Sequence, residues 1–308
     1  MQTINTTVRR GLAKFGKATL SFEEATAAAN YSVSKEEIFD ADGAALPREF
    51  RGMFNGNTRK CIGVVGDGFT FYQPAESLEI MRAAVETVSG ARWQSVAIGG
   101  GGASLYAFAA LQTEITAPKR GDKVGLSFFM RDGFDGTTRQ SWGVAAETLA
   151  CTNGALRSEN LFAFTGKHTR TLRDRIDAVR LEMGMRVQDE VEKLRGFVHR
   201  LDSQDMSRAE MDNFSLALFG VANERALSDE ATAQVRTKVD TVRMLFARGT
   251  GNVGRTRWDA FNAVTEFADW ESSFRSTSAA SAEENRFESM MGGTVLRLKD
   301  RAAELLLS

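Results

Sequence analysis

The sequence contains few of the residues from which disulfide frameworks, metal sites and stiff linkers are built. Its 308 residues include two cysteines, two histidines and three prolines. Cys61 and Cys151 are isolated, and neither belongs to a CxxC pair, which excludes a disulfide framework and favours a reducing cytoplasm. His168 and His199 do not have the spacing of metal ligands. Three prolines are too few for a long proline-rich linker.

A strong net charge and a long apolar run are also missing. The formal net charge is −1, so no field of the whole protein attracts nucleic acid or an anionic membrane, although a local basic groove is compatible with this value. The cations near the N-terminus, from Arg9 to Lys17, precede no continuous apolar stretch, so we expect neither a signal peptide nor a transmembrane span. The composition is that of an ordinary globular protein, in one large domain or two smaller ones.

The stretch from Gly63 to Gly154 predicts an antiparallel β-meander flanked by helices. A helix is expected from Ala75 to Val88, and a second helical run from about Ala145. Between them, apolar and aromatic residues alternate in strand-like segments that turns such as Asp132–Gly136 connect. The predicted strands of the meander are Arg92–Ile98, Ser104–Thr116, Lys123–Arg131 and Thr137–Val144. Before the meander we expect a capped helix after Ser21 and short strands at Ile38-Phe39, Glu49–Met53 and Cys61–Val65.

The C-terminal half predicts helices. Apolar residues recur every three or four positions from Leu172 to Leu201, which indicates one long amphipathic helix. Further helices are expected after the capping residues Ser207, Ser228 and Thr256, and a last one over Glu283–Leu307. The fold class is therefore α+β: a central antiparallel sheet followed by a mainly helical half. We place the boundary near Arg157–Gly166, which gives an α+β domain over 1–160 and a helical domain over 161–308.

No catalytic constellation stands out, and we predict no catalytic residue, metal or cofactor. Gly99–Gly102 lacks the following Lys-Ser/Thr of a phosphate loop and predicts a hairpin tip. Asp67, Asp132 and Asp135 would be the ligands of a magnesium site in a metal-dependent nucleic-acid enzyme. All three sit beside glycines, where turn formation alone explains an aspartate. This enzyme is the least favoured of three alternatives.

A binding surface has more support in the sequence, because cations and aromatic residues lie along the predicted meander. Cations that hold phosphates and aromatic rings that stack on bases form a platform for single-stranded nucleic acid. In the alternative interpretation the aromatic residues belong to the core. Across the hairpin, Arg131 and Arg139 are expected close together, with Lys119 and Arg120 at the opposite end. The candidate DNA-binding residues are Arg92, Lys119, Arg120, Lys123, Arg131, Arg139, Trp142 and Tyr106.

Several short motifs lie along most of the chain: Gly63-Val64-Val65-Gly66-Asp67-Gly68-Phe69, Tyr72-Gln73-Pro74, Asp135-Gly136-Thr137, Glu147–Asn153, Lys167-His168-Thr169, and Gly251-Asn252 followed by Trp258–Asp269. Together they resemble the phage/plasmid-like protein family of unknown function. Where that family usually has His and Asn, this chain has Trp270 and Pro74. The resemblance implies a mobile-element protein in a bacterial host cytoplasm.

A more distant resemblance concerns the order of elements. A helix, an antiparallel meander and a following helix are similar to the core of the RecT, Red-beta and Erf single-strand annealing proteins. That likeness implies an ATP-independent oligomer that binds single-stranded DNA in a groove beside the sheet. Our leading hypothesis is a single-stranded DNA binding and annealing protein that assists phage or plasmid recombination or replication. Its expected partners are single-stranded DNA, further copies of itself and phage or host replication proteins, without a membrane. The main alternative is a phage structural or interaction protein that does not bind DNA.

Overall fold

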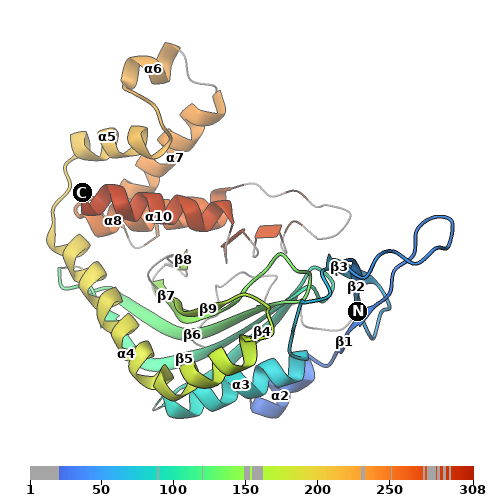
Figure 1. The fold of residues 1–308 in the computed structure, drawn as a ribbon. Helices are drawn as coiled ribbons and strands as arrows, with labels where there is room; N and C mark the ends of the chain where they lie inside the picture. Colours follow the sequence, from blue (N-terminus) through green and yellow to red (C-terminus); the bar gives the residue numbers. More distant parts are fainter. Residues whose placement is uncertain are drawn as a thin grey trace.

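A computed structural model shows the α+β fold that the sequence predicts (Figure 1). The structure describes residues 21–88, 90–119, 121–148, 153–154, 162–229, 233–250, 252–272, 275, 282, 285–286, 289–290 and 293–308. Two antiparallel sheets occupy the N-terminal half, and the C-terminal half is mainly helical. No helix in the described residues is long and apolar enough to cross a membrane.

The large sheet has six strands, and its centre is the predicted meander. Strands β4 (Arg92–Gly99), β5 (Ser104–Thr116), β6 (Lys123–Gly133) and β7 (Gln140–Thr148) pair in chain order. Two further strands, β8 (Asn153–Gly154) and β9 (Phe162–Gly166), both pair with β7. The sheet thus continues past residue 160, and the division into two domains stays a prediction. The prediction of a helix from Ala145 is wrong, because hydrogen bonding to β6 keeps the chain extended up to Thr148.

A smaller, three-stranded antiparallel sheet precedes the meander. Its strands are β1 (Val33–Glu36), β2 (Arg51–Asn55) and β3 (Cys61–Val65). The strand predicted at Cys61–Val65 is confirmed, whereas Ile38-Phe39 forms only an isolated bridge through Phe39. The chain between β1 and β2 makes a loop that projects from the molecule, dark blue in Figure 1.

Three helices cover one face of the large sheet and enclose the main core (Figure 1). They are α2 (Phe22–Ala28), α3 (Pro74–Thr87) and α4 (Leu172–Ser203). The capping box that Ser21 and Glu24 predict is present at the start of α2. In α4 the members of the predicted apolar stripe whose side chains are described are buried: Leu172, Ile176, Val187, Val191, Leu194, Val198 and Leu201. This packing follows from the helical period of the stripe.

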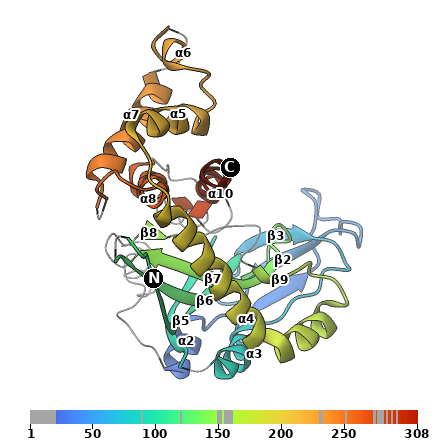
Figure 2. The same ribbon diagram turned by 90° about the vertical axis from the view of Figure 1, so that its left-hand side faces the viewer.

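The remaining helices lie on the other side of the sheet and beyond it (Figure 2). They are α5 (Arg208–Leu218), α6 (Glu224–Asp229), α7 (Ala233–Arg248), α8 (Arg257–Glu266), η1 (Phe267–Glu271) and α10 (Thr294–Leu307). The capping boxes predicted at Ser207 and Thr256 are confirmed. Ser228 lies inside α6 and does not cap α7, so the prediction of a capping residue at this position is wrong. Residues of η1 and α10 pack on the second face of the sheet, against Tyr106, Phe108 and Phe129.

Candidate functional site

The predicted DNA-binding lysines each have an acidic partner. Lys119 Nζ lies 2.7 Å from Asp205 Oδ1, and Lys123 Nζ lies 3.1 Å from Glu114 Oε2. Exposed ion pairs of this kind contribute little stability, yet they reduce the local positive charge. Arg120 lies outside the described residues. The hairpin between β5 and β6 is thus less basic than its sequence indicates.

The predicted arginines occupy both ends of the sheet. Arg92 is exposed at the start of β4, and Arg139 is exposed just before β7. Arg131 is half-buried, with its guanidinium carbon 5.6 Å from the centroid of the Tyr106 ring. Because Arg131 faces Ser141 across the β6–β7 ladder, Arg131 and Arg139 lie toward the same end of the hairpin. DNA binding by these cations stays a prediction.

The two predicted stacking residues are core residues instead. Tyr106 and Trp142 are both 0% exposed. Tyr106 belongs to the cluster between the sheet and η1 with α10, and Trp142 meets the edge of Phe128 at 6.3 Å on the opposite face. Both faces of these central strands are covered by helices, so any large ring on them becomes buried. Neither ring offers a face on which a base could stack.

Three segments that are distant in the sequence meet around one buried carboxylate, and we call their four polar residues the His168 cluster: Ser77 of α3, Asp132 and Gln140 of the β6–β7 hairpin, and His168. Ser77 of α3 donates a hydrogen bond to Asp132 Oδ2 at 2.6 Å. Gln140 Nε2 lies 3.4 Å from the same oxygen, and His168 Nε2 lies 3.2 Å from Asp132 Oδ1. Asp132, Ser77 and Gln140 are fully buried, and His168 is 7% exposed.

Both ring nitrogens of His168 face oxygen acceptors. Nδ1 lies 3.0 Å from the carbonyl oxygen of Thr70, while Nε2 faces Asp132. Burial lowers the pKa of His168, but the contact with Asp132, the charge of Asp132, the Thr70 carbonyl and the charge of Asp135 together raise it by more. The net result is a raised pKa, which favours the doubly protonated ring. Burial also raises the pKa of Tyr31, and the charge of Asp132 raises it further.

The geometry of the His168 cluster is that of a structural ion pair rather than a catalytic triad. In a triad the serine binds the histidine, which takes its proton, and the carboxylate orients the histidine from behind. Here Ser77 and His168 both bind Asp132, and Nδ1 of His168 faces a backbone carbonyl. The Ser77 hydroxyl therefore donates to the carboxylate itself and not to an imidazole.

The backbones around this cluster are packed as closely as glycine allows. A Cβ atom on Gly63 of β3 would lie 2.5 Å from the Cα of Asp135 in the β6–β7 hairpin. A Cβ atom on Gly136, where φ is +85°, would lie 2.8 Å from Val65. Glycine is therefore required where β3 crosses the hairpin.

At the surface above the cluster lie two partly exposed aromatic rings. The ring centroid of Phe69 is 4.9 Å from that of His168 and 6.1 Å from that of Phe71, and the two phenylalanine rings are stacked. Lys35 Nζ fixes the loop by donating hydrogen bonds to the carbonyl oxygens of Asp67 and Phe69, at 2.8 and 3.1 Å. The rings are thus held in place while part of each stays accessible.

Exposed cations, which we call the basic edge, flank the same place: Arg139, Lys167 and Arg170. Gln140 pairs with Gly166 in the β7–β9 ladder, so the next position on each strand is occupied by Arg139 and Lys167. Arg170 follows within the turn that leads into α4. Within the described part of the chain, none of the three has an ion-pair partner. Of this group, Arg139 is one of the DNA-binding residues predicted from the sequence.

The aspartates that would form a magnesium site do not converge. Asp67 lies 3.7 Å from Arg51, Asp135 accepts hydrogen bonds from Thr137, and Asp132 holds His168. Among the described residues, no group of three or more His, Cys, Asp or Glu side chains is arranged to hold a metal ion.

A second buried polar group lies in the helical half. Lys299 Nζ of α10 and Asp269 Oδ1 of η1 are 2.6 Å apart, and both side chains are at most 1% exposed. Glu266 accepts hydrogen bonds from the backbone and hydroxyl of Thr250, and burial raises its pKa. The contacts of these two carboxylates with Thr250 and Lys299 lie within the helical half.

One comparison with known proteins identifies a family. The family model described as a domain of unknown function (DUF932) matches residues 61–291. The chain belongs to the DUF932 family. No curated protein and no solved structure matches it. The DUF932 match contains the whole His168 cluster and the basic edge, and it begins at the first residue of β3. Its description states no activity and no connection to phages, plasmids or annealing proteins.

Proposed function

We propose that this DUF932 protein binds single-stranded DNA and anneals complementary strands, as an accessory of phage or plasmid recombination or replication. One observation carries the proposal: exposed cations and partly exposed aromatic rings meet at the rigid junction around His168. Arg139, Lys167 and Arg170 supply positive charge for phosphates. Phe69 and Phe71 supply ring surface for bases. Proteins that bind single strands combine these two features.

The position of the surface also favours a flexible, unpaired strand. The aromatic rings lie between the small sheet and the end of the β7–β9 ladder, where several segments meet, instead of on one protruding helix. Because the net charge is only −1, binding must come from this local charge and should weaken as salt increases. The distant likeness to annealing proteins supports the second part of the proposal, the pairing of two bound strands.

A salt titration tests the proposal most directly. We would measure the affinity for a fluorescent oligonucleotide by anisotropy, and annealing by the quenching of two labelled complementary strands. Replacing the three cations of the basic edge by glutamine should make binding less sensitive to salt. The slope of log affinity against log salt concentration should become shallower by about 0.7 for each phosphate that is no longer bound. Lys238→Gln, at an exposed position of α7 outside the candidate DNA-binding residues, is a single-charge control. If wild-type protein does not bind single strands at low salt, the proposed function is refuted.

The alternative of an interaction protein has one specific observation in its favour. Large apolar side chains are exposed on the small sheet, at Val64, on the chain between β1 and β2, and at a groove in the helical half. These surfaces are compatible with DNA binding elsewhere on the molecule.

A further inference from the structure

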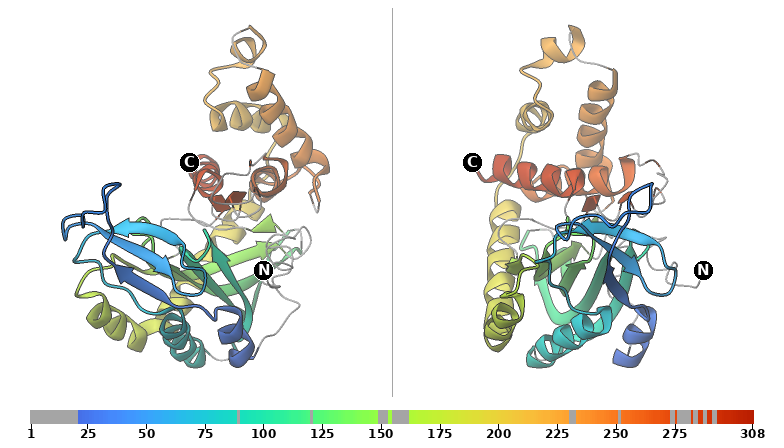
Figure 3. Two further views of the ribbon diagram at one scale, coloured as in Figure 1. Left: turned by 90° about the vertical axis from the view of Figure 1, so that its right-hand side faces the viewer. Right: turned by 45° about the vertical axis from the view of Figure 1, so that its right-hand side comes forward.

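Two polar contacts join the loop that carries the exposed aromatic rings to the chain at His168. His168 Nδ1 lies 3.0 Å from the carbonyl oxygen of Thr70, and the Thr70 N–H group donates to the carbonyl oxygen of His168 at 3.2 Å. Thr70 stands between Phe69 and Phe71, the two stacked rings of the candidate DNA site. This loop leads from β3 of the small sheet to α3 on the large sheet (Figure 3). The imidazole of His168 therefore contacts the middle of the loop directly.

The His168 ring also lies against the first of the two aromatic side chains. Its centroid is 4.9 Å from that of Phe69, with 32° between the ring planes. A cation within about 6 Å of an aromatic centroid is attracted to the ring. A protonated His168 thus holds the Phe69 ring through its charge and the Thr70 backbone through its Nδ1–H group.

Both ring nitrogens of His168 must carry a proton for these contacts to be attractive. The Thr70 carbonyl and the ionised Asp132 carboxylate are acceptors only. A neutral imidazole has one N–H group and one lone pair, so one of its nitrogens then faces an oxygen, at 3.0 or 3.2 Å, without a proton. Deprotonation of His168 consequently turns one attractive contact into a repulsive one.

The Asp132 side of the ring is less able to move than the loop. The Asp132 carboxylate is fully buried and accepts hydrogen bonds from the Ser77 hydroxyl at 2.6 Å and from the Gly133 N–H group at 2.9 Å. Thr70 and Phe71, in contrast, are partly exposed. Loss of a proton from His168 should therefore displace Thr70 and Phe71 rather than Asp132.

Charged and titratable groups lie on each of the elements around His168. Burial raises the pKa of Tyr31, which stays neutral, and the carboxylates of the hairpin favour the protonated ring. Since the pKa of His168 is raised above its ordinary value of about 6.5, the ring is protonated at about pH 6 and becomes neutral as the pH rises through this higher pKa. The groups include Asp132 and Asp135 of the hairpin, Asp67 of the loop, Tyr31 before β1, Lys35 of β1, and Lys167 and Arg170 beside His168.

We propose that His168 is a positioning residue for single-stranded DNA: its doubly protonated ring holds Phe69 and Phe71 in the arrangement that stacks on bases, and its deprotonation releases them. This inference rests on the proposed DNA-binding function and adds a regulation of that site by pH. His168 is only 7% exposed, so it acts through the two rings and not as a phosphate contact. The affinity should therefore decrease as His168 loses its proton, while the slope of log affinity against log salt concentration stays constant.

Fluorescence anisotropy of a labelled oligothymidine, bound to the full chain at about pH 6 and 9, measures this effect. Stacking on an aromatic ring contributes roughly 5- to 150-fold in affinity for each base, so partial release of the two rings should weaken binding on the order of tenfold. Nuclear magnetic resonance of the histidine side chains follows the His168 titration, since the chain has only two histidines. The midpoints of the binding curve and of the His168 titration should coincide.

Two neutral variants separate positioning from stability. In His168→Asn the amide nitrogen takes the place of Nδ1 and still donates to the Thr70 carbonyl, whereas in His168→Gln it takes the place of Nε2 and faces Asp132. Neither side chain titrates. At both pH values His168→Asn should bind within about threefold of wild type at the lower pH, and His168→Gln should bind on the order of tenfold more weakly.

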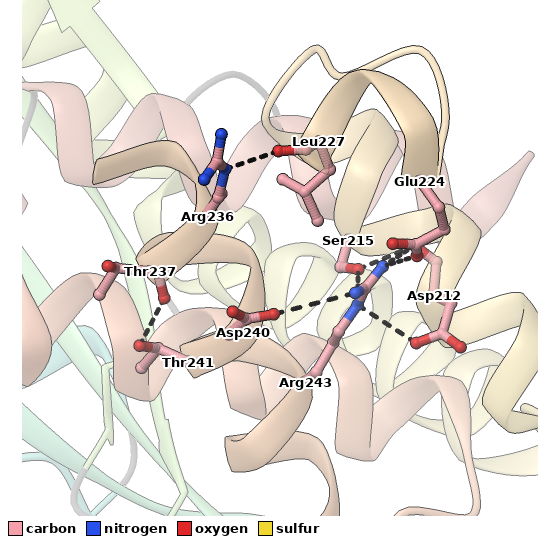
Figure 4. Close-up of polar contacts among 9 residues, drawn as sticks. All are labelled: Asp212, Ser215, Glu224, Leu227, Arg236, Thr237, Asp240, Thr241 and Arg243. Carbon is pink, nitrogen blue, oxygen red and sulfur yellow. Dashed lines mark hydrogen bonds and ion pairs between the residues drawn. The ribbon is translucent and has the colours of Figure 1, made fainter. Parts of the chain in front are cut away.

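His199→Gln and Ser215→Ala are the controls. His199 is the other histidine of the chain and is exposed on α4. Ser215 accepts a hydrogen bond from Arg243 Nε at 2.8 Å in the helical half (Figure 4), so Ser215→Ala loosens the fold without touching the loop. Both controls should keep the pH dependence of wild type.

The outcomes distinguish this inference from the proposed function. Absence of binding by wild type at both pH values and at low salt would refute DNA binding, and this inference with it. Binding that is equally tight at both pH values, or equally weakened in the two His168 variants, would overturn the role of His168 and leave DNA binding standing. So would a salt slope that changes with pH, or a binding midpoint that differs from that of His168, which are comparisons that need only the wild-type chain.

Discussion

Asp132→Asn is the most informative single change, because Asp132 holds three segments together: α3, the β6–β7 hairpin and the chain at His168. Ser77, Gln140 and His168 all contact its carboxylate, which is fully buried. Asparagine keeps the shape and can still accept the Ser77 hydroxyl. It removes the charge and places either a neutral oxygen or an amide N–H group against His168. The protonated ring then loses its ionic partner.

The expected cost is about 3 kcal/mol at low pH. Breaking one side of a buried ion pair typically costs roughly 3–5 kcal/mol. The lower end applies here, because His168 can release its proton and avoid a buried unpaired charge. In domains of 150–250 residues, 1 kcal/mol corresponds to roughly 2–4 °C in Tm, so we expect a decrease of about 6–12 °C.

The pH dependence has a definite sign. The folded pKa of His168 is raised above its ordinary value of about 6.5. The ion pair therefore contributes fully below about pH 6.5, and its contribution disappears as the pH rises through the folded pKa. The difference in stability between wild type and Asp132→Asn should be largest near pH 5.5 and smaller near pH 9.

Thermal unfolding followed by circular dichroism at about pH 5.5, 7 and 9 measures both effects. Ser77→Ala is one control: it removes a hydrogen bond but no charge, so it should cost about 1 kcal/mol at every pH. Asp189→Asn, on the exposed face of α4, should change stability by less than about 0.5 kcal/mol. Equal Tm values for wild type and Asp132→Asn at low pH, or a difference that grows with pH, would refute the reasoning.

Three further changes test the packing. Gly63→Ala should cost about 1–3 kcal/mol in urea denaturation, because its Cβ meets hairpin backbone, whereas Gly68→Ala, with open space around it, should be nearly neutral. Lys299→Met should cost about 3–5 kcal/mol, and adding Asp269→Leu should recover much of it, since the buried charge is then gone; no recovery in the double variant would argue against the pair. Val191→Asp should cost several kcal/mol, on the order of the penalty for an unpaired polar group in an apolar seam; a wild-type Tm would show that the α4 stripe is not buried.

The strands and long helices follow from local patterns, which is why the sequence predicts them well. In β5 successive side chains point to opposite faces of the sheet, and most side chains on both faces are apolar. The predicted bounds Ser104–Thr116 are those observed. The stripe from Leu172 to Leu201 defines α4 almost completely. The extension of β7 to Thr148 is different, because Ala145–Thr148 is helix-prone in isolation and becomes strand only through pairing with β6. Strand β9 is likewise stabilised by its neighbour β7.

The site could be predicted only in part, because its residues converge through tertiary structure. Asp132 precedes a glycine, and its local sequence indicates a turn. In the fold, its position at the end of β6 directs it into a buried contact with His168, 36 positions later in the chain by residue number. By residue type, Tyr106 and Trp142 suit a stacking platform, but the helices that cover both faces of the sheet bury them. The family motifs at Gly63 and His168 were the only signal that these segments belong together.

The family match and the folded unit have different limits. The match begins at Cys61, the first residue of β3, and ends before α10. Yet β3 pairs with β2, outside the match, and Met53 of β2 is fully buried in the core. At the other end, Lys299 of α10 neutralises Asp269. A chain limited to residues 61–291 would expose an unpaired strand edge and leave Asp269 without its lysine partner, and both are destabilising. The stable unit therefore extends to both sides of the match, and DNA binding and annealing must be measured on the full chain.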